Sequence, residues 1–273
     1  MQTSGTILLH IDSSAGTPSR IKLARQMADD FGVEVIGQPC VLTALLRYPF
    51  SMDGAAAAVA LMRKLDRENN EKMRANFLLL TEGHGRMHWF EPLADGPWGF
   101  ARRALYADLM ILGQRDPDDP SDSELPTDFV SSTLLESGRP ALVLPYTGVT
   151  GPMGSTVLLA WKETREAARA VSAALPWLQR ARQVHAVCFG KEQDSALHSL
   201  QSYLQSHGVS ITSHAGGIED GEIGNRLLSL AVDVGADLLV MGCYGHGRAR
   251  EWVLGGATRT VLRTMTLPVL MAH

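Results

Sequence analysis

The sequence predicts an α/β fold with a mainly parallel sheet, present twice in one chain. Short, continuous apolar runs alternate with longer segments in which apolar residues recur at helical spacing, and this alternation is typical of strand–helix–strand units. Three short sequences of the first half also recur in the same order in the second half: 6–12 at 156–162, 107–114 at 236–243, and 139–144 at 267–271. Ordered repeats of this kind predict two copies of one structural unit.

Each copy is expected to form a five-stranded sheet with helices on both faces, because right-handed crossovers between parallel strands place helices on both sides. We place the first copy at residues 1–147 and the second at 154–273. The stretch between them is rich in Gly, Pro and Thr, a composition that suits a linker.

The second copy carries the clearer pattern. We expect its strands at 155–161, 183–189, 209–214, 237–241 and 267–272, and its helices after Thr164 and at 195–205, 222–234 and 257–264. Thr164 is a candidate N-cap, because a hydroxyl at that position accepts a hydrogen bond from a free amide of the first turn. The first copy follows the same order, except that a long helical stretch at 53–80, rich in alanine near its start, precedes a strand at 86–90.

Composition indicates an ordinary globular protein. Of 273 residues, 45% are hydrophobic and 20% are charged, and the formal net charge is -4. A negative balance argues against nucleic acid or a membrane surface as a general partner, because both attract a basic excess. We read no signal peptide around the short apolar run at 7–11, and no apolar run approaches the roughly 20 residues that span a bilayer. The three cysteines are widely spaced and suggest no disulfide framework. We therefore expect a cytoplasmic protein.

A glycine-rich segment is the sharpest motif of the chain. Gly242-Cys-Tyr-Gly245 is followed, after nine residues, by Gly255-Gly256-Ala257-Thr258, between a predicted strand and a predicted helix. Glycines permit backbone conformations in which amide groups converge on an anion, and a helix N-terminus adds free N–H donors. On chemistry alone the segment is either a phosphate cradle or a surface loop that needs glycines for its turns.

The spacing G-x2-G-x9-G, followed by a small or hydroxyl residue, resembles the nucleotide loop of the universal stress protein family. The run 245–258, and Ala160-Trp161 followed by 164–168, resemble the proteobacterial branch of that family, and two copies in one chain resemble its tandem members. The resemblance implies flavodoxin-like domains of the adenine-nucleotide-alpha-hydrolase type. It also implies ATP, with or without Mg, bound at the loop of the second copy.

The resemblance assigns a binding role to residues of the second copy. On the adenosine side it implies Met241 and Gly242, with Ala160 and Trp161 at the end of the first strand and Val187 near the end of the second. Around the phosphates it implies Gly245, Gly255, Gly256, Ala257 and Thr258, with His246 approaching a phosphate.

Two positions depart from the family pattern. Lys162 stands where the family has an acidic residue after the first strand, which removes a carboxylate that could serve the ribose or a metal ion. Gly256 stands where a Ser or Thr is expected, which removes one hydroxyl donor.

The first copy is expected not to bind nucleotide. Its counterpart of the glycine loop, at 114–126, has prolines that remove N–H donors and acids that would repel a phosphate. The acids are Asp116, Asp118, Asp119, Asp122 and Glu124. We interpret this segment as a solvated acidic loop. Asp12 keeps the family's acid, but no cradle lies beside it in the sequence.

The expected function is that of a stress-response sensor or binding module with one adenine nucleotide site. No catalytic residue and no metal ligand set is predicted, and His84 and His88 have no cysteine or carboxylate pair beside them. Slow ATP hydrolysis would need only the electrostatics of a phosphate cradle. The alternatives are a nucleotide-independent interaction scaffold with a relic loop, and an enzyme using a cleft of the enlarged first copy, which no catalytic constellation supports.

The final strands of the two copies, 141–145 and 269–272, are expected to pair antiparallel, because an exposed apolar edge strand invites aggregation. Such pairing predicts an intramolecular pseudo-dimer. A homodimer is the further assembly that the resemblance allows.

Overall fold

The structure is a computed structural model that describes residues 5–44, 56–93, 95–121, 124–149, 151–218, 222–243 and 256–273. By its contacts the chain divides into two compact units, Met1–Arg139 and Pro140–His273. The division lies a few residues before the linker expected from composition, so that the last strand of the first sequence repeat belongs to the second unit.

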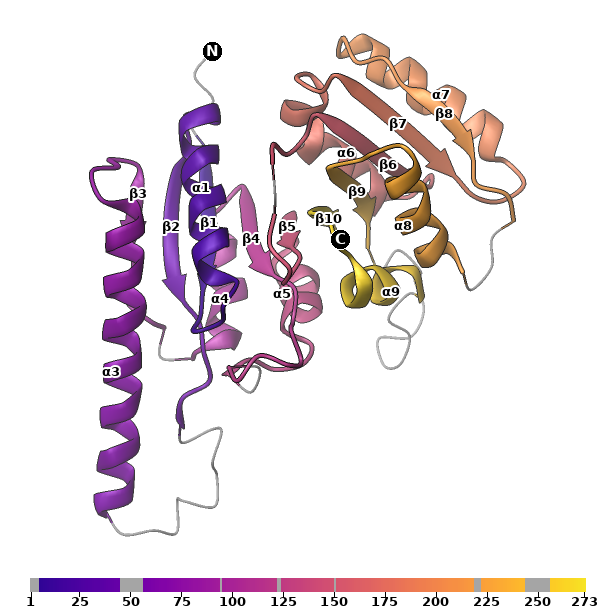
Figure 1. The fold of residues 1–273 in the computed structure, drawn as a ribbon. Coiled ribbons are helices and arrows are strands. Elements are labelled where there is room, and N and C mark those ends of the chain that lie inside the picture. Colours follow the sequence, from indigo (N-terminus) through magenta and orange to yellow (C-terminus); the bar gives the residue numbers. More distant parts are fainter. Residues whose placement is uncertain are drawn as a thin grey trace. The chain divides into compact units, whose positions relative to one another are not determined.

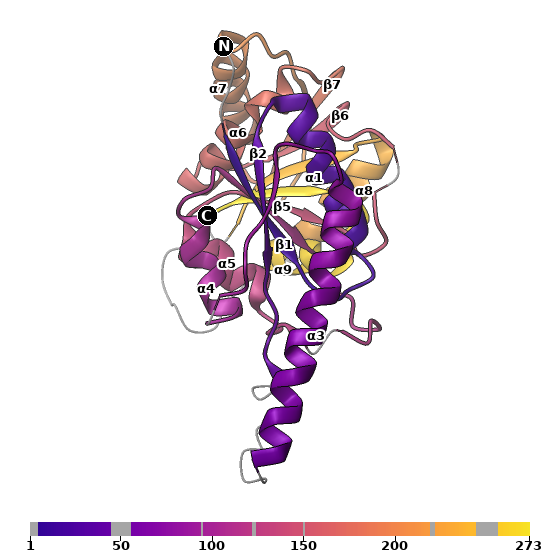
Figure 2. The same cartoon turned by 90° about the vertical axis from the view of Figure 1, so that its left-hand side faces the viewer.

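The first unit is built around four parallel strands in the order β3-β2-β1-β4. The strands are β1 (Thr6–Ile11), β2 (Glu34–Pro39), β3 (Met87–Trp89) and β4 (Leu109–Gly113). The helices are α1 (Thr17–Phe31), α3 (Ala56–Thr81), α4 (Pro97–Ala104) and α5 (Phe129–Ser137). Helices α1 and α3 cover one face of the strands, and α4 and α5 cover the other (Figures 1 and 2).

The long helix α3 confirms the expected helical stretch, but it packs over only part of its length. Its buried residues, Met73, Phe77 and Thr81, all lie in its second half. A Cβ at Gly37 would lie 2.5 Å from the Phe77 ring, so the absence of a side chain lets β2 approach this helix. Leu61 and Leu65, in the first half, are exposed, and Figure 2 shows that part of α3 extending beyond the strands.

The second unit repeats the pattern around the order β5-β10-β9-β6-β7-β8. Its strands are β5 (Ala141–Leu144), β6 (Thr156–Trp161), β7 (Gln183–Cys188), β8 (Thr212–Ala215), β9 (Leu238–Gly242) and β10 (Val269–Ala272). Its helices are α6 (Arg165–Leu178), α7 (Gln193–Ser206), α8 (Ile223–Asp233) and α9 (Gly256–Thr264). The Thr164 hydroxyl caps α6 by accepting a hydrogen bond from the Ala167 amide, as its sequence position predicts.

The expected pairing of the two final strands is confirmed. Strands β5 and β10 run antiparallel with Val143 opposite Val269 and Leu142 opposite Leu270, and all of these side chains are buried. All other pairs in the unit are parallel. Each of these apolar strands thereby gains a hydrogen-bonded neighbour on the side that would otherwise be a bare edge.

One predicted strand is displaced. The expectation of a strand at 209–214 is wrong at its start, because β8 begins only at Thr212. The preceding residues belong to the end of α7: Gly208 adopts a left-handed conformation with φ of 74°, and the Val209 amide donates to the Leu204 carbonyl. That bond closes the helix C-terminus, and Val209 packs in the core without joining the sheet.

Across the described ranges, no helix combines the length and the apolar composition that crossing a membrane would require.

Candidate functional site

In each unit the direction of strand order reverses between two central strands, and ligands of open α/β sheets bind beyond the carboxyl ends of such strands. The reversal falls between β6 and β9 in the second unit and between β1 and β4 in the first. The candidate sites are therefore the carboxyl ends of β6 and β9 in the second unit and of β1 and β4 in the first. Different groups lie at these ends in the two units.

At the second unit's candidate site, three predicted residues share one row. Ala160 on β6 lies opposite Val187 on β7 and opposite Met241 on β9. Residues opposite one another in a parallel pair project to the same face of the sheet. Val187 and Met241 are buried and Ala160 is half-buried, so the row is apolar and closed at its two sides.

Trp161 ends β6 directly after this row. Its side chain is half-buried, and its indole Nε1 is buried without a hydrogen-bond partner in the part of the chain that the structure describes. A buried N–H without an acceptor is costly, and such groups are rare in native structures unless a ligand or water meets them. Lys162, which follows, is exposed.

Gly242, the last residue of β9, is required by close packing. A Cβ at this position would lie 2.5 Å from the Ala167 amide nitrogen and 2.8 Å from the Glu166 carbonyl carbon. These are backbone atoms of the first turn of α6 and cannot rotate away. The glycine therefore brings the start of α6 against the strand ends, where the site is expected.

The predicted phosphate residues are described only in part. Gly256, Ala257 and Thr258 form the first turn of α9, whose N-terminal amides lack partners within the helix. The Thr258 side chain is 4% exposed, while a Cβ at Gly256 would meet no described atom within 4 Å. Gly245, His246 and Gly255 lie outside the described residues.

The cysteine of this region is buried and protonated near neutral pH. Cys243 follows Gly242, is buried and forms no disulfide. Burial, with a smaller contribution from the charge of Glu166, raises the pKa of its thiol to about 12. A thiol with that pKa stays protonated at neutral pH. No group of three or more His, Cys, Asp and Glu side chains is arranged to hold a metal ion anywhere in the described ranges.

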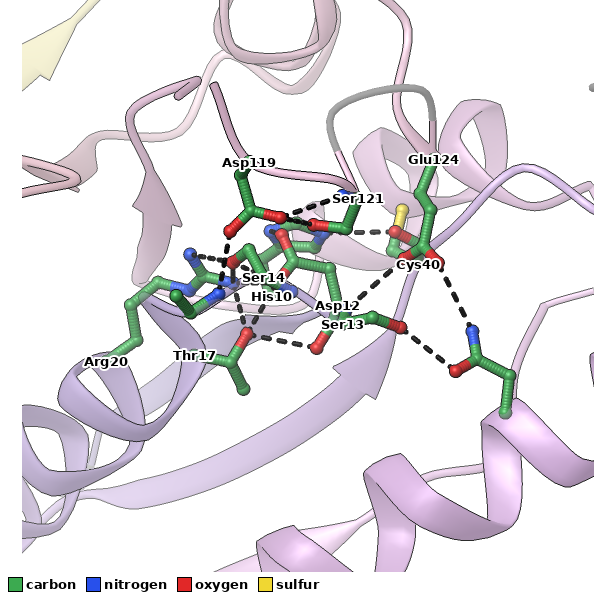
Figure 3. Close-up of polar contacts among 12 residues, drawn as sticks. His10, Asp12, Ser13, Ser14, Thr17, Arg20, Cys40, Asp119, Ser121 and Glu124 are labelled. Atoms are coloured by element: carbon green, nitrogen blue, oxygen red, sulfur yellow. Dashed lines mark hydrogen bonds and ion pairs between the residues drawn. The ribbon is translucent and has the colours of Figure 1, made fainter. Parts of the chain in front are cut away.

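In the first unit the strand ends carry a buried ion pair (Figure 3). Asp12, just after β1, is 7% exposed, and Arg20 on α1 is 4% exposed. The Arg20 Nη2 donates to Asp12 Oδ1 and, at 2.6 Å, to the Thr17 hydroxyl. The amide and hydroxyl of Ser14 also donate to Asp12 Oδ1, at 3.0 and 2.6 Å. The acid that this copy keeps from the family pattern thus accepts hydrogen bonds within the chain through its Oδ1.

The environment of Asp12 keeps it ionised. Burial alone would raise the pKa of this carboxyl, but the charge of Arg20, with His10 and the hydroxyls of Ser14 and Thr17, lowers the pKa far below its usual value. Asp12 is therefore a carboxylate near neutral pH.

The guanidinium of Arg20 also covers the end of β4. A Cβ at Gly113 would lie 2.1 Å from Arg20 Nη1. Gly113 is the counterpart of Gly242 in the sequence repeat, yet at Gly242 the close neighbours are backbone atoms of α6. A charged side chain thus lies at the strand ends of the first unit, where the second unit has helix backbone.

Two acids of the first unit's acidic segment, Asp119 and Glu124, are not solvated as composition predicts, whereas Asp118 is exposed as expected and Asp122 lies outside the described residues. Glu124 is 6% exposed and accepts a hydrogen bond from the Ser13 amide at 3.3 Å, while half-buried Asp119 accepts one from the Ala15 amide at 3.0 Å. Without partners, acids this close together in sequence would remain in water, because their charges repel one another and burial would cost them their hydration. Unpaired backbone amides at the turn between β1 and α1 provide the partners that composition cannot reveal.

Arg20 is the site residue that the sequence reasoning missed. A signal for it exists: Arg20 lies on the face of α1 that also carries the buried residues Thr17, Ile21, Ala24 and Ala28. A charged side chain on an apolar helical face needs a buried partner. Asp12, eight residues earlier at a strand end, was the available one.

His10, on β1, makes the stability of the first unit dependent on pH. It is buried against the rings of Phe100 and Phe129, and its Nε2 lies 3.0 Å from the Cys40 carbonyl oxygen. Burial, opposed by the charge of Asp12, lowers the pKa of this imidazole to about 4. It is therefore neutral at pH 7 and donates from Nε2.

We expect the free energy of unfolding of the first unit to fall by about 3 kcal/mol as pH drops from 6.5 to 4. Within that window the unfolded chain takes up a proton at His10 that the folded unit refuses. Hydrogen exchange of β1 amides, measured at both ends of the window, checks this. In His10→Gln most of the pH dependence of the free energy of unfolding should vanish, whereas His88→Gln, at an exposed histidine, should retain it. Equal pH dependence in the two variants would contradict the assignment to His10.

Comparisons with known proteins agree with this architecture. Residues 191–273 match the model of the Universal stress protein family. The whole chain resembles a universal stress protein from Archaeoglobus fulgidus DSM 4304, with a TM-score of 0.72 and 14% identity over 99% of this chain and 98% of that one. It also resembles a functionally unknown protein from Pseudomonas aeruginosa PAO1, with a TM-score of 0.64 and 17% identity over 99% and 93%. A comparison with curated proteins found no match. Residues 191–273 thus match the universal stress protein family, and the chain as a whole has the fold seen in a universal stress protein.

Proposed function

We propose that the second unit binds an adenine nucleotide, ATP, beyond the carboxyl ends of β6, β7 and β9, and that the chain acts as a binding module of the stress response. The observation that carries the proposal is the row formed by Ala160, Val187 and Met241 at the strand-order reversal. An apolar, partly open row at that position suits the flat face of a base.

Three further features support a nucleotide in particular. The buried indole Nε1 of Trp161, which has no acceptor in the described part of the chain, is a donor for a ring nitrogen or a ribose oxygen. The first turn of α9 has amides without partners within the helix and a partial positive charge, both of which suit phosphates. Lys162, exposed beside the row, favours an anionic ligand over a metal-bridged one.

The proposal predicts one nucleotide per chain. In the first unit the ion pair of Asp12 and Arg20 occupies the equivalent strand ends, and carboxylates line the turn beside it. Calorimetric titration of the full chain with ATP should therefore give a stoichiometry near one. Two equivalent sites per chain would contradict the proposal.

A substitution in the row tests the position of the base. Ala160→Phe should fill the space above the row and lower ATP affinity by at least about tenfold, because a planar base and a phenyl ring cannot share it. Ala168→Phe, the same change at an exposed position of α6, is the matched control. Equal ATP affinities of the two variants would show that the base does not bind at this row.

Mass spectrometry of molecules released from the denatured protein tests the ligand itself. A stoichiometric adenine nucleotide is the expected result. If none is released and the chain binds neither ATP, ADP nor a cyclic adenine nucleotide, the nucleotide-independent scaffold is the correct function.

A further inference from the structure

We propose that the acidic segment after β4 is an intramolecular ligand of the first unit through two of its side chains: the carboxylates of Asp119 and Glu124 occupy anion positions at the turn between β1 and α1 and close that unit to phosphate-bearing molecules. The proposal concerns the first unit alone and does not depend on nucleotide binding by the second. It rests on which groups meet at the strand ends of β1 and β4, shown in Figure 3.

The turn presents a row of amide donors, and each meets a carboxylate. The amides of Ser13, Ser14 and Ala15 donate to Glu124 Oε2 at 3.3 Å, to Asp12 Oδ1 at 3.0 Å and to Asp119 Oδ2 at 3.0 Å, respectively. Successive amides that converge on negative oxygens are the arrangement by which backbone turns bind phosphate. Two of the three oxygens come from the acidic segment, more than 100 residues away in the sequence.

A buried cation stands beside the same turn. Arg20 is 4% exposed, and its Nη1 and Nη2 each lie 3.4 Å from the Ser14 hydroxyl oxygen. Its Nε is buried and has no partner in the described ranges. Arg20 neutralises Asp12, so the turn carries less negative charge than its carboxylates alone would give it.

The segment is organised to present its carboxylates. Asp119 is oriented through its other oxygen, Oδ1, which accepts from the amide and hydroxyl of Ser121 at 2.8 and 2.5 Å. Glu124 is oriented by Asn69 of α3, whose Nδ2 donates to Oε1 at 3.4 Å while its Oδ1 accepts from the Ser13 hydroxyl at 3.0 Å. Both acids therefore bind the turn with defined geometry.

The position of the turn in the fold indicates what the contact with Asp119 and Glu124 does. The turn follows β1, beside β4, at the strand-order reversal where ligands of such sheets bind. A phosphate-bearing molecule can reach the amides of Ser13 and Ala15 only if Glu124 and Asp119 leave. The segment thus acts as an autoinhibitory contact whose release would open an anion site in the first unit.

Hydrogen exchange of the full chain tests the contact. In Asp119→Ala the amide of Ala15 should exchange roughly 10- to 100-fold faster than in the unaltered chain, because its charge-assisted hydrogen bond to Asp119 is lost. Asp118→Ala removes the same charge from an exposed position of the segment and should leave the rate unchanged. Equal rates in the two variants would overturn the proposal.

Inorganic pyrophosphate tests whether the vacated positions bind an anion. It should slow exchange at 13–15 in Asp119→Ala, more strongly in Asp119→Ala/Glu124→Gln, and not in the unaltered chain at the same concentration. Because the measurement is local to 13–15, pyrophosphate bound by the second unit does not affect it. Faster exchange without any pyrophosphate-dependent protection in Asp119→Ala would show that the segment only packs against the turn, and would overturn its role as a ligand.

Discussion

Replacing Arg20 with Met is expected to lower the free energy of unfolding of the first unit by about 3–5 kcal/mol, because it leaves a buried carboxylate without its counter-charge. Asp12 is 7% exposed, and Arg20 is the main group that opposes the effect of burial on the pKa of this carboxyl. Without Arg20, the folded unit must hold an unpaired buried carboxylate or take up a proton there, and either outcome costs stability near neutral pH. Methionine keeps most of the aliphatic volume, so the loss reports charge and not a cavity.

A double-mutant cycle separates the pair from its surroundings. Asp12→Asn alone leaves a buried guanidinium unpaired and should also be costly, while Asp12→Asn/Arg20→Met should recover a large share of the loss, because both charges are gone. Hydrogen exchange of β1 amides reports the first unit separately from the second, which a single denaturation curve of a two-unit chain does not. Losses that simply add in the double variant would show that the two side chains are not coupled.

Replacing Gly242 with Val is expected to destabilise the second unit by about 2–4 kcal/mol and to abolish nucleotide binding there, because two atoms of rigid backbone stand where the new side chain must go. The Cβ would lie 2.5 Å from the Ala167 nitrogen and 2.8 Å from the Glu166 carbonyl carbon. Relief requires α6 to move away from β9, and that movement distorts the strand ends proposed to hold the base.

Gly256→Ala is the matched control. A Cβ there meets no described atom within 4 Å, and Gly256 begins α9, so alanine should be neutral or should stabilise by up to about 1 kcal/mol. Thermal unfolding followed by hydrogen exchange of β9 measures the first effect, and titration with ATP measures the second. If the Gly242→Val variant had unchanged stability, the close approach of α6 to β9 would be wrong. If it were destabilised but bound ATP normally, only the proposed position of the nucleotide would be wrong.

The architecture was predictable because it depends on local, periodic information. Buried parallel strands need continuous apolar runs such as Ile7–Ile11, and amphipathic helices need apolar residues at helical spacing. The repeat doubled that information, and it predicted the antiparallel contact of Val143 with Val269 because both copies end in an apolar strand that needs a neighbour. The prediction failed at Val209, where apolar character was needed for the core but the amide was already used to end a helix.

The candidate sites also have some features that the sequence predicts and others that it does not. Strand ends and glycine positions place Ala160, Val187 and Met241 in one row, and this follows from sequence order and register. The partners of buried charges do not follow from order, because they depend on which side chains a turn brings within hydrogen-bond distance.

By itself the sequence determined the doubled α/β fold, the order of its elements and the strand ends at which a ligand would bind, since hydrophobic periodicity and repeats specify these locally. Only the tertiary structure decided that Arg20 neutralises Asp12 and that Asp119 and Glu124 bind the turn at 13–15. Composition alone suggests that five acids within nine residues are all solvated. Folding brings two of them to amides that would otherwise lack partners, and the electrostatic attraction at that short distance outweighs the preference of the carboxylates for water.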